Sequence, residues 1–158
     1  MGAVGLGERL LALLPVGSSD FRTHLAGAAV SLGFDGLASD GAPPEEPSGG
    51  LPLVVALGLP NLSALREAVR RGAQQIEVPF AMELAAAGQA LTTSGPLVVH
   101  DRAGDEEPLD SGCDCPACRF SLGYLAHLVR AGETLAETLL LLHNLRTVVR
   151  LIGAPPAL

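Results

Sequence analysis

Apolar residues in the first half of the chain alternate between short continuous runs and segments of helical periodicity. The short runs predict strands, and the run LVVAL is apolar on both faces, as in a buried parallel sheet. The first run is also compatible with the end of a helix that begins near Gly7, because periodicity does not separate these options. The predicted strands are Leu10–Val16, Phe34–Ala38, Leu53–Leu57 and Gln75–Val78.

Helices are predicted between these strands, over residues 21–32 and 63–72. Gly33 is expected to end the first of them in the left-handed conformation that glycine adopts easily. Strands that alternate with helices indicate an α/β fold with a parallel sheet. The predicted strands would make part of a β/α barrel, since a complete barrel has eight strands and typically about 250 residues.

The pattern changes in the second half, where the sequence predicts a β-hairpin, an acidic loop and two helices. Ser94 and Gly95 are suitable turn residues for the hairpin. The predicted segments are the hairpin strands Gln89–Thr93 and Pro96–His100, the loop Asp101–Asp110, and helices over Phe120–Arg130 and from Thr134 to about Ile152.

Composition narrows the classes of binding partner. The ten basic residues are all arginine, and the formal net charge is -7. An acidic chain is a poor general binder of phosphate backbones, and 3% aromatic residues leave little material for stacking on bases. Arg66, Arg70 and Arg71 cluster on one predicted helix, and we interpret them as a solvated helix face.

The beginning of the chain does not have the pattern of a signal peptide. Glu8 and Arg9 interrupt its apolar residues, and it has no basic n-region. No apolar run in the sequence is long enough to span a bilayer. Clustered cysteines in an odd number favour a reducing compartment. We therefore predict a cytoplasmic protein without membrane association.

All the cysteines fall in one C-x-C-x-x-C cluster, formed by Cys113, Cys115 and Cys118. Three thiolates and one imidazole suit a four-coordinate Zn²⁺ ion, and a site closed by four protein ligands would be structural. Local geometry allows either His127 or His143 to supply the fourth ligand, because the two predicted helices can fold back as a hairpin. His143 could instead be a core histidine that binds a backbone carbonyl.

The segment CDCPACRFSLGYLAHLVRAGETLAETLLLLHNL resembles the zinc-binding C-terminal region of the tRNA-guanine transglycosylases. This family includes the bacterial preQ1-inserting enzyme and the eukaryotic queuine tRNA-ribosyltransferase with its noncatalytic partner subunit. The shared pattern is the cysteine cluster, a Tyr-Leu-x-His-Leu stretch, an Ala-Gly-Glu turn and a helix with Leu-x-x-His-Asn. The resemblance implies one structural Zn²⁺ per chain, bound by Cys113, Cys115, Cys118 and His143.

The resemblance extends upstream to about Leu10. The segments that carry it are LGFDGLASDG, LVVALGLPNLSALREAVRRG and RRGAQQIEVPFAMELAAAGQALTT. They correspond to the second half of the family's TIM-type barrel. The resemblance thus implies a partial β/α-barrel region over residues 1–93 and a zinc-binding subdomain over residues 94–158, which contains the hairpin, the cysteine loop and two helices.

The family's reaction requires a carboxylate that attacks the ribose of guanosine, so that guanine leaves and a deazaguanine replaces it. Glu77 stands at the position of this nucleophile, where the family has aspartate. The Pro-Thr-Arg that follows in the family is here Ala81-Met82-Glu83, and a second arginine is Ala86. We therefore interpret Glu77 as a remnant of the catalytic carboxylate or an ordinary carboxylate at a strand end.

Three functions are compatible with these residues. The first is a noncatalytic or truncated transglycosylase-family protein, linked to queuosine-type tRNA modification. It would form a homo- or heterodimer with a transglycosylase subunit and meet tRNA through that partner. The second is an active tRNA-ribosyltransferase with Glu77 as nucleophile. The third is a zinc-stabilised interaction module without a role in tRNA modification.

Overall fold

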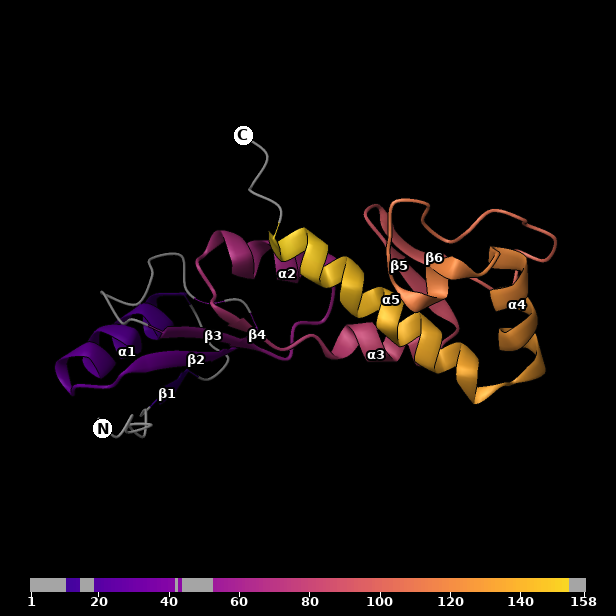
Figure 1. Cartoon of the computed structure of the whole chain (residues 1–158). Coiled ribbons are helices and arrows are strands. Elements are labelled where there is room, and N and C mark those ends of the chain that lie inside the picture. The colour runs from indigo at the N-terminus through magenta and orange to yellow at the C-terminus, as the bar shows by residue number, and fades with distance from the viewer. Residues whose placement is uncertain (1–10, 15–18, 42, 44–52, 154–158) are drawn as a thin grey trace, which may run out of the picture. The chain divides into compact units, whose positions relative to one another are not determined.

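The computed structural model describes residues 11–14, 19–41, 43 and 53–153 (Figure 1). The described residues belong to two compact units, Met1–Val78 and Pro79–Leu158. The polar positions Glu8 and Arg9, and the ends of the predicted strand Leu10–Val16, lie outside the described residues. Across the part of the chain that is described, no helix combines the length and the apolar character needed to cross a membrane.

The first unit is built on a parallel sheet, in which each described strand pairs with the next one along the chain (Figure 1). Helix α1 joins the first two strands and helix α2 joins the last two. This arrangement confirms the predicted parallel α/β fold, and it is compatible with a section of a β/α barrel. The elements are β1 (Leu11–Leu14), α1 (Ser19–Ser31), β2 (Gly36–Asp40), β3 (Leu53–Leu57), α2 (Leu62–Arg70) and β4 (Gln75–Ile76).

Local signals in the sequence set the helix ends of this unit. The Asn61 side chain accepts a hydrogen bond from the Ala64 amide at 2.9 Å, which caps α2. Gly33 has a φ of 77°, and the following Phe34 amide donates to the Ala29 carbonyl, which ends α1. Buried aliphatic side chains of β2 and β3, such as Leu37, then form the core under the helices.

The arginine cluster of α2 is partly neutralised within its own helix. Arg70 and Arg71 both bind the carboxylate of Glu67, and Arg71 also donates to the Pro43 carbonyl. Their hydrogen bonds lower the pKa of Glu67 to about 2. These contacts agree with the interpretation of this surface as a solvated helix face, because the charges of Arg70 and Arg71 are paired with a carboxylate of their own helix.

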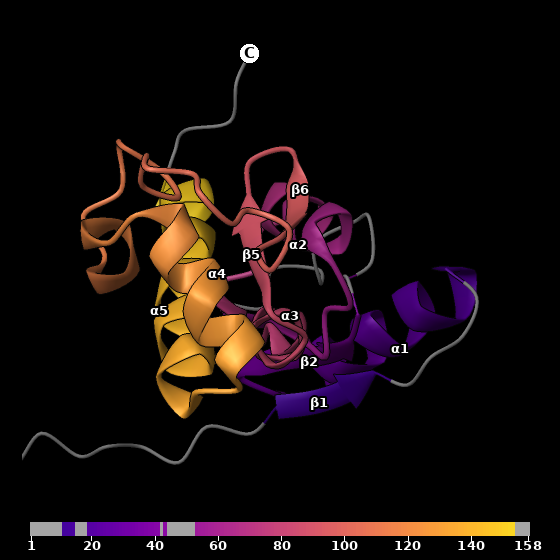
Figure 2. The same cartoon turned by 90° about the vertical axis from the view of Figure 1, so that its right-hand side faces the viewer.

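The second unit is organised around its longest helix, α5, against which α3, α4 and β5 pack (Figures 1 and 2). A 3₁₀ helix, η2, also packs on α5. The hairpin is antiparallel, with Thr92 opposite Gly95, as the turn residues predicted. The elements are α3 (Pro79–Ala86), β5 (Gln89–Thr92), β6 (Gly95–Val98), η2 (Pro116–Arg119), α4 (Leu122–Ala131) and α5 (Thr134–Gly153).

Helix α3 was not among the elements predicted from the sequence. It begins at Pro79, whose fixed φ suits the first turn of a helix, and Gly88 follows its end with a φ of 67°. Gly88 also lies against α4, since a Cβ at this position would come within 2.8 Å of Val129. The signal for this helix was therefore present as a proline start and a glycine end around an alanine-rich segment.

The boundary between the compact units lies between Val78 and Pro79. The division predicted from the resemblance, after residue 93, falls in the turn between β5 and β6. The reason for the difference is that α3 and β5 both pack on α5.

The core of the second unit is aliphatic and includes the buried cysteines Cys113 and Cys115.

Candidate metal centre

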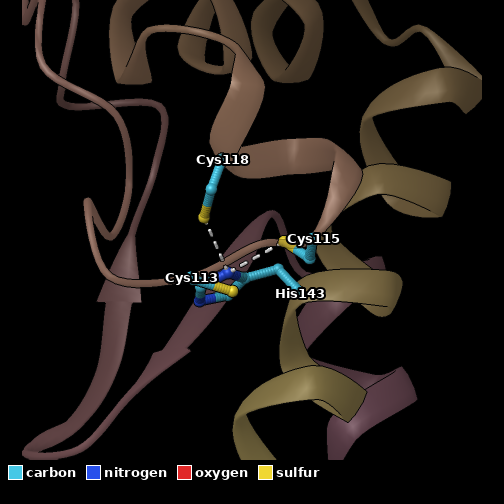
Figure 3. Close-up of side chains that lie close together, drawn as sticks. All are labelled: Cys113, Cys115, Cys118 and His143. Carbon is cyan, nitrogen blue, oxygen red and sulfur yellow. Dashed lines mark hydrogen bonds between the residues drawn. The ribbon is translucent and has the colours of Figure 1, made fainter.

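The structure gathers three thiols and one imidazole at one point of the second unit (Figure 3). The ligand atoms of Cys113, Cys115, Cys118 and His143 all lie within 4.8 Å of one another. The His143 Nδ1 atom is 3.5 Å from the Cys115 Sγ and 3.3 Å from the Cys118 Sγ. Sulfur and nitrogen ligands of a tetrahedral Zn²⁺ ion are separated by about 3.6 Å, and these two distances are close to that separation.

Tight turns bring the cysteines together. The Cys113 amide donates to the Asp110 carbonyl at 3.1 Å, and the Cys118 amide donates to the Cys115 carbonyl at 3.2 Å. Pro116 stands at the start of η2, which carries Cys118. These turns close over the aliphatic core, so Cys113 and Cys115 are buried, and Cys118 is partly buried.

His143 is fixed by contacts on both sides of its ring. Its Nε2 atom lies 3.0 Å from the Leu91 carbonyl, an acceptor that requires a proton on this nitrogen. The other nitrogen, Nδ1, then has a free lone pair and faces the sulfurs of Cys115 and Cys118 (Figure 3). A carbonyl that holds the non-ligating nitrogen is the usual support of a metal-binding histidine.

Asn144, the next residue of α5, connects the helix to β5 and α3. Its side-chain oxygen accepts from the Leu91 amide at 2.6 Å, and its nitrogen donates to the carbonyls of Ala81 and Gln89 at 3.0 Å and 3.2 Å. The side chain is fully buried. Sequence reasoning did not single out this role; the signal was a polar residue beside His143 in an otherwise leucine-rich helix.

Burial shifts the pKa values of the site toward neutral side chains. It raises the pKa of the Cys115 and Cys118 thiols and lowers the pKa of His143. The imidazole is therefore ready to act as a ligand, whereas thiols must release protons when a cation binds.

The competing candidates lie outside the cluster. His127 is exposed on α4 and is not part of the ligand group. Asp114, between the first two cysteines, is exposed and forms an ion pair with Arg146. Asp114 thus binds α5 and is not part of the ligand group.

Glu77, the candidate nucleophile, follows β4 at the carboxyl edge of the parallel sheet. Its Oε2 atom accepts a hydrogen bond from the Gly58 amide at 2.9 Å, and its backbone carbonyl accepts one from Leu59 at 3.2 Å. Asp40 ends β2, which pairs with the other edge of β3, and a Cβ on Gly58 would lie 3.3 Å from its Oδ1 atom. Two carboxylates thus flank the end of β3, and sequence reasoning had not paired Asp40 with Glu77.

The segment that replaces the family's Pro-Thr-Arg lies in α3. Ala81 is buried and its carbonyl binds Asn144, whereas Met82 and Glu83 are exposed. None of these side chains offers the cationic group of an arginine. This part of the chain therefore contributes to the packing of α3 rather than a basic surface.

A parallel α/β unit joined to a helical unit with a three-cysteine, one-histidine cluster defines a class of β/α proteins that carry a metal subdomain. Comparison with known proteins narrows the class to one family. The profile of the family described as Queuine tRNA-ribosyltransferase matches residues 13–154, and the chain belongs to this family. The resemblance stated from the sequence is thereby confirmed.

Curated relatives share about a third of their aligned residues with this chain. The protein named Queuine tRNA-ribosyltransferase from Sphingopyxis alaskensis is 35% identical over 143 residues, which cover 78% of this chain and 38% of the relative. The protein of the same name from Azotobacter vinelandii is 34% identical over 150 residues, which cover 84% of this chain and 40% of the relative. The chain thus spans about two fifths of the length of these relatives.

Proposed function

We propose that this chain is a noncatalytic member of the queuine tRNA-ribosyltransferase family, with a structural Zn²⁺ ion in its second unit. The observation that carries the proposal is a contrast between two sites. All four ligand positions of the metal cluster are present and gathered, whereas Ala81-Met82-Glu83 replaces the Pro-Thr-Arg that follows the family nucleophile. The metal site, which would stabilise the fold, is kept, whereas the segment that follows the position of the catalytic carboxylate is changed.

Zinc is the metal that this donor set favours. Thiolates and imidazole in a tetrahedral arrangement are typical of Zn²⁺, and Cys113, Cys115, Cys118 and His143 would occupy all four positions. No position is then open for water, so the ion would stabilise the fold rather than activate a reactant. The partial β/α barrel of the first unit would correspond to the second half of the family barrel.

An active transglycosylase is the second candidate, because Glu77 lies at the carboxyl edge of a parallel sheet, where β/α-barrel enzymes place catalytic residues. Two features weigh against it. The carboxylate already accepts the Gly58 amide, and glutamate extends one methylene beyond the family's aspartate. A displacement of about 1 Å at a reacting atom can reduce the rate about a hundredfold.

Glu77→Gln separates these candidates. Glutamine keeps an oxygen that accepts the Gly58 amide but cannot act as a nucleophile. We expect the chain alone to incorporate no labelled guanine into tRNA. We expect a mixture of the chain with the full-length Sphingopyxis alaskensis relative to have the same activity whether position 77 is glutamate or glutamine. Incorporation by the chain alone that disappears in Glu77→Gln would establish the active enzyme instead.

Partner binding is the second expectation of the proposal. The protein would act in the cytoplasm as a homo- or heterodimer with a transglycosylase subunit and would meet tRNA through that subunit. A full-length relative should therefore co-purify with the tagged chain and give it the ability to retain tRNA on a filter. A chain that stays monomeric beside this relative and retains no tRNA would favour a zinc-stabilised module without a role in tRNA modification.

A further inference from the structure

We propose that two ion pairs from α5, Arg146–Asp114 and Arg150–Asp110, hold the cysteine loop in place around the metal and slow its release. This inference rests on the proposed metal site and assigns positioning residues to it. Neither arginine is a ligand. Each one fixes a carboxylate in the loop that presents Cys113 and Cys115.

One face of α5 carries both the histidine ligand and the two arginines. Arg146 is three residues after His143 and Arg150 is seven residues after it, so all three side chains lie on the same side of the helix. The cysteine loop packs against this side through η2. Helix α5 therefore holds the loop at three points, which are the ligand His143 and the two ion pairs.

The first pair is attached between two ligands. Asp114 stands between Cys113 and Cys115, and both of its oxygens are bound by Arg146. The Arg146 Nε atom donates to Oδ1 at 2.6 Å, and Nη2 donates to Oδ2 at 2.9 Å. Two parallel hydrogen bonds fix the orientation of a carboxylate as well as its distance.

The second pair supports the turn that leads into the cluster. Asp110 Oδ2 accepts from Arg150 Nη1 at 2.7 Å, and the Oδ1 atom accepts from the Gly112 amide at 2.8 Å. The backbone carbonyl of Asp110 also accepts the Cys113 amide. One aspartate thus connects α5 to the turn that places Cys113, and loss of Arg150 would release this turn from the helix.

The positive charges of the two arginines are complementary to the charge that the site would carry with zinc bound. Three thiolates around a divalent ion leave one net negative charge. The Arg150 guanidinium lies beside Cys113, since a Cβ on the preceding Gly112 would be 3.7 Å from its Nη2 atom, and Arg146 binds Asp114, the residue after Cys113. The positive charges of the two arginines would favour the zinc-bound state, even though each arginine also neutralises an aspartate.

Solvent exposure limits the size of the effect. The side chains of Arg146 and Asp114 are 42% and 72% exposed, and those of Arg150 and Asp110 are 41% and 37% exposed. An open cavity of about 790 Å³ also reaches Asp110, His143 and Arg150. Exposed ion pairs contribute little individually, so we expect each lost pair to accelerate metal release about threefold and both together about tenfold.

The test measures zinc release from the full-length, zinc-loaded chain to a chromogenic chelator. The variants are Arg146→Gln, Asp114→Asn, Arg150→Gln, the combination of Arg146→Gln with Asp114→Asn, and the combination of Arg146→Gln with Arg150→Gln. Each single change should accelerate release, whereas Asp114→Asn should add little once Arg146→Gln is present, because the two residues act as one pair. Release from the parent should also quicken in molar salt, which screens the pairs, and release from Arg146→Gln combined with Arg150→Gln should respond less.

Arg130→Gln is the matched control, since Arg130 is exposed at the end of α4 and has no ion pair among the described residues. It should leave the release rate unchanged. Release at the parent rate in all the ion-pair variants, or equal acceleration in Arg130→Gln, would overturn this inference and leave the metal site standing. A parent chain that binds no zinc would overturn both.

Discussion

Replacement of Cys115 by serine is expected to reduce the zinc content from one ion per chain to nearly none. Cys115 is 5% exposed and lies within the aliphatic core of the second unit. A serine hydroxyl is a poor ligand for Zn²⁺, and it would leave an unsatisfied polar group in this core. Elemental analysis of the purified variant measures the metal directly.

The same substitution should destabilise the second unit by several kcal/mol. Three of the four ligands come from one loop, and we expect the ion to hold this loop in its folded conformation, so that metal binding and folding of the loop are coupled. Structural zinc in small domains binds with an apparent free energy of about 10–16 kcal/mol, and part of it stabilises the fold. Chelation of zinc from the parent should reproduce the loss of helix signal and the lower unfolding temperature.

Ser111→Ala is the matched control for this prediction. Ser111 precedes the cluster and is exposed, so its replacement should change neither the zinc content nor the unfolding temperature. Zinc content at the parent level in Cys115→Ser would mean that the assigned ligand set is wrong. Loss of zinc without loss of stability would instead separate metal binding from folding of the unit.

Acid should weaken zinc binding in a defined direction. Burial raises the pKa of the Cys115 and Cys118 thiols, so both carry protons in the metal-free chain at neutral pH. Zinc must displace these protons, and falling pH therefore favours the metal-free state. His143 adds little to this dependence near neutral pH, because burial lowers its pKa and the imidazole is already neutral.

The metal cluster was the most predictable part of this protein. Cysteine spacing alone indicated a metal site, because three thiols within a few residues of one chain meet without help from tertiary structure. The choice between His127 and His143 depended on how two helices fold back, and periodicity alone does not determine this. His143 also proved to bind a backbone carbonyl through its Nε2 atom, while its Nδ1 atom faces the cysteine sulfurs. A carbonyl contact and a role as ligand are therefore compatible in this residue, because they use different nitrogens.

Contacts between distant segments were not predictable. Leu91 and His143 are 52 positions apart, and nothing in either segment indicates the carbonyl that fixes the imidazole. The parallel sheet followed from alternating apolar runs and helical segments, yet α3 was missed because its alanine-rich sequence has no clear apolar stripe. The proximity of Asp40 and Glu77 likewise depends on the pairing of β2, β3 and β4.

Asn144→Leu should be the most damaging substitution outside the ligand set. Leucine has the same branched shape but is larger and has no polar atoms, so the Leu91 amide and the carbonyls of Ala81 and Gln89 would each lose the hydrogen bond with Asn144 inside the core. An unsatisfied buried group costs about 1–3 kcal/mol, and we expect a total loss of about 3–6 kcal/mol because the three costs overlap. Chemical denaturation of the zinc-loaded variant measures this loss.

Asn144→Asp and Leu145→Ala distinguish lost hydrogen bonds from a general disturbance of α5. Aspartate can still accept the Leu91 amide but cannot donate to the two carbonyls, so it should also be strongly destabilising. Leu145 is 40% exposed on the same helix, and its truncation should cost far less. Because Leu91 also carries the carbonyl that orients His143, Asn144→Leu should accelerate zinc release as well as unfolding. A stability within about 1 kcal/mol of the parent would show that β5 is held to α5 by apolar packing and not by this side chain.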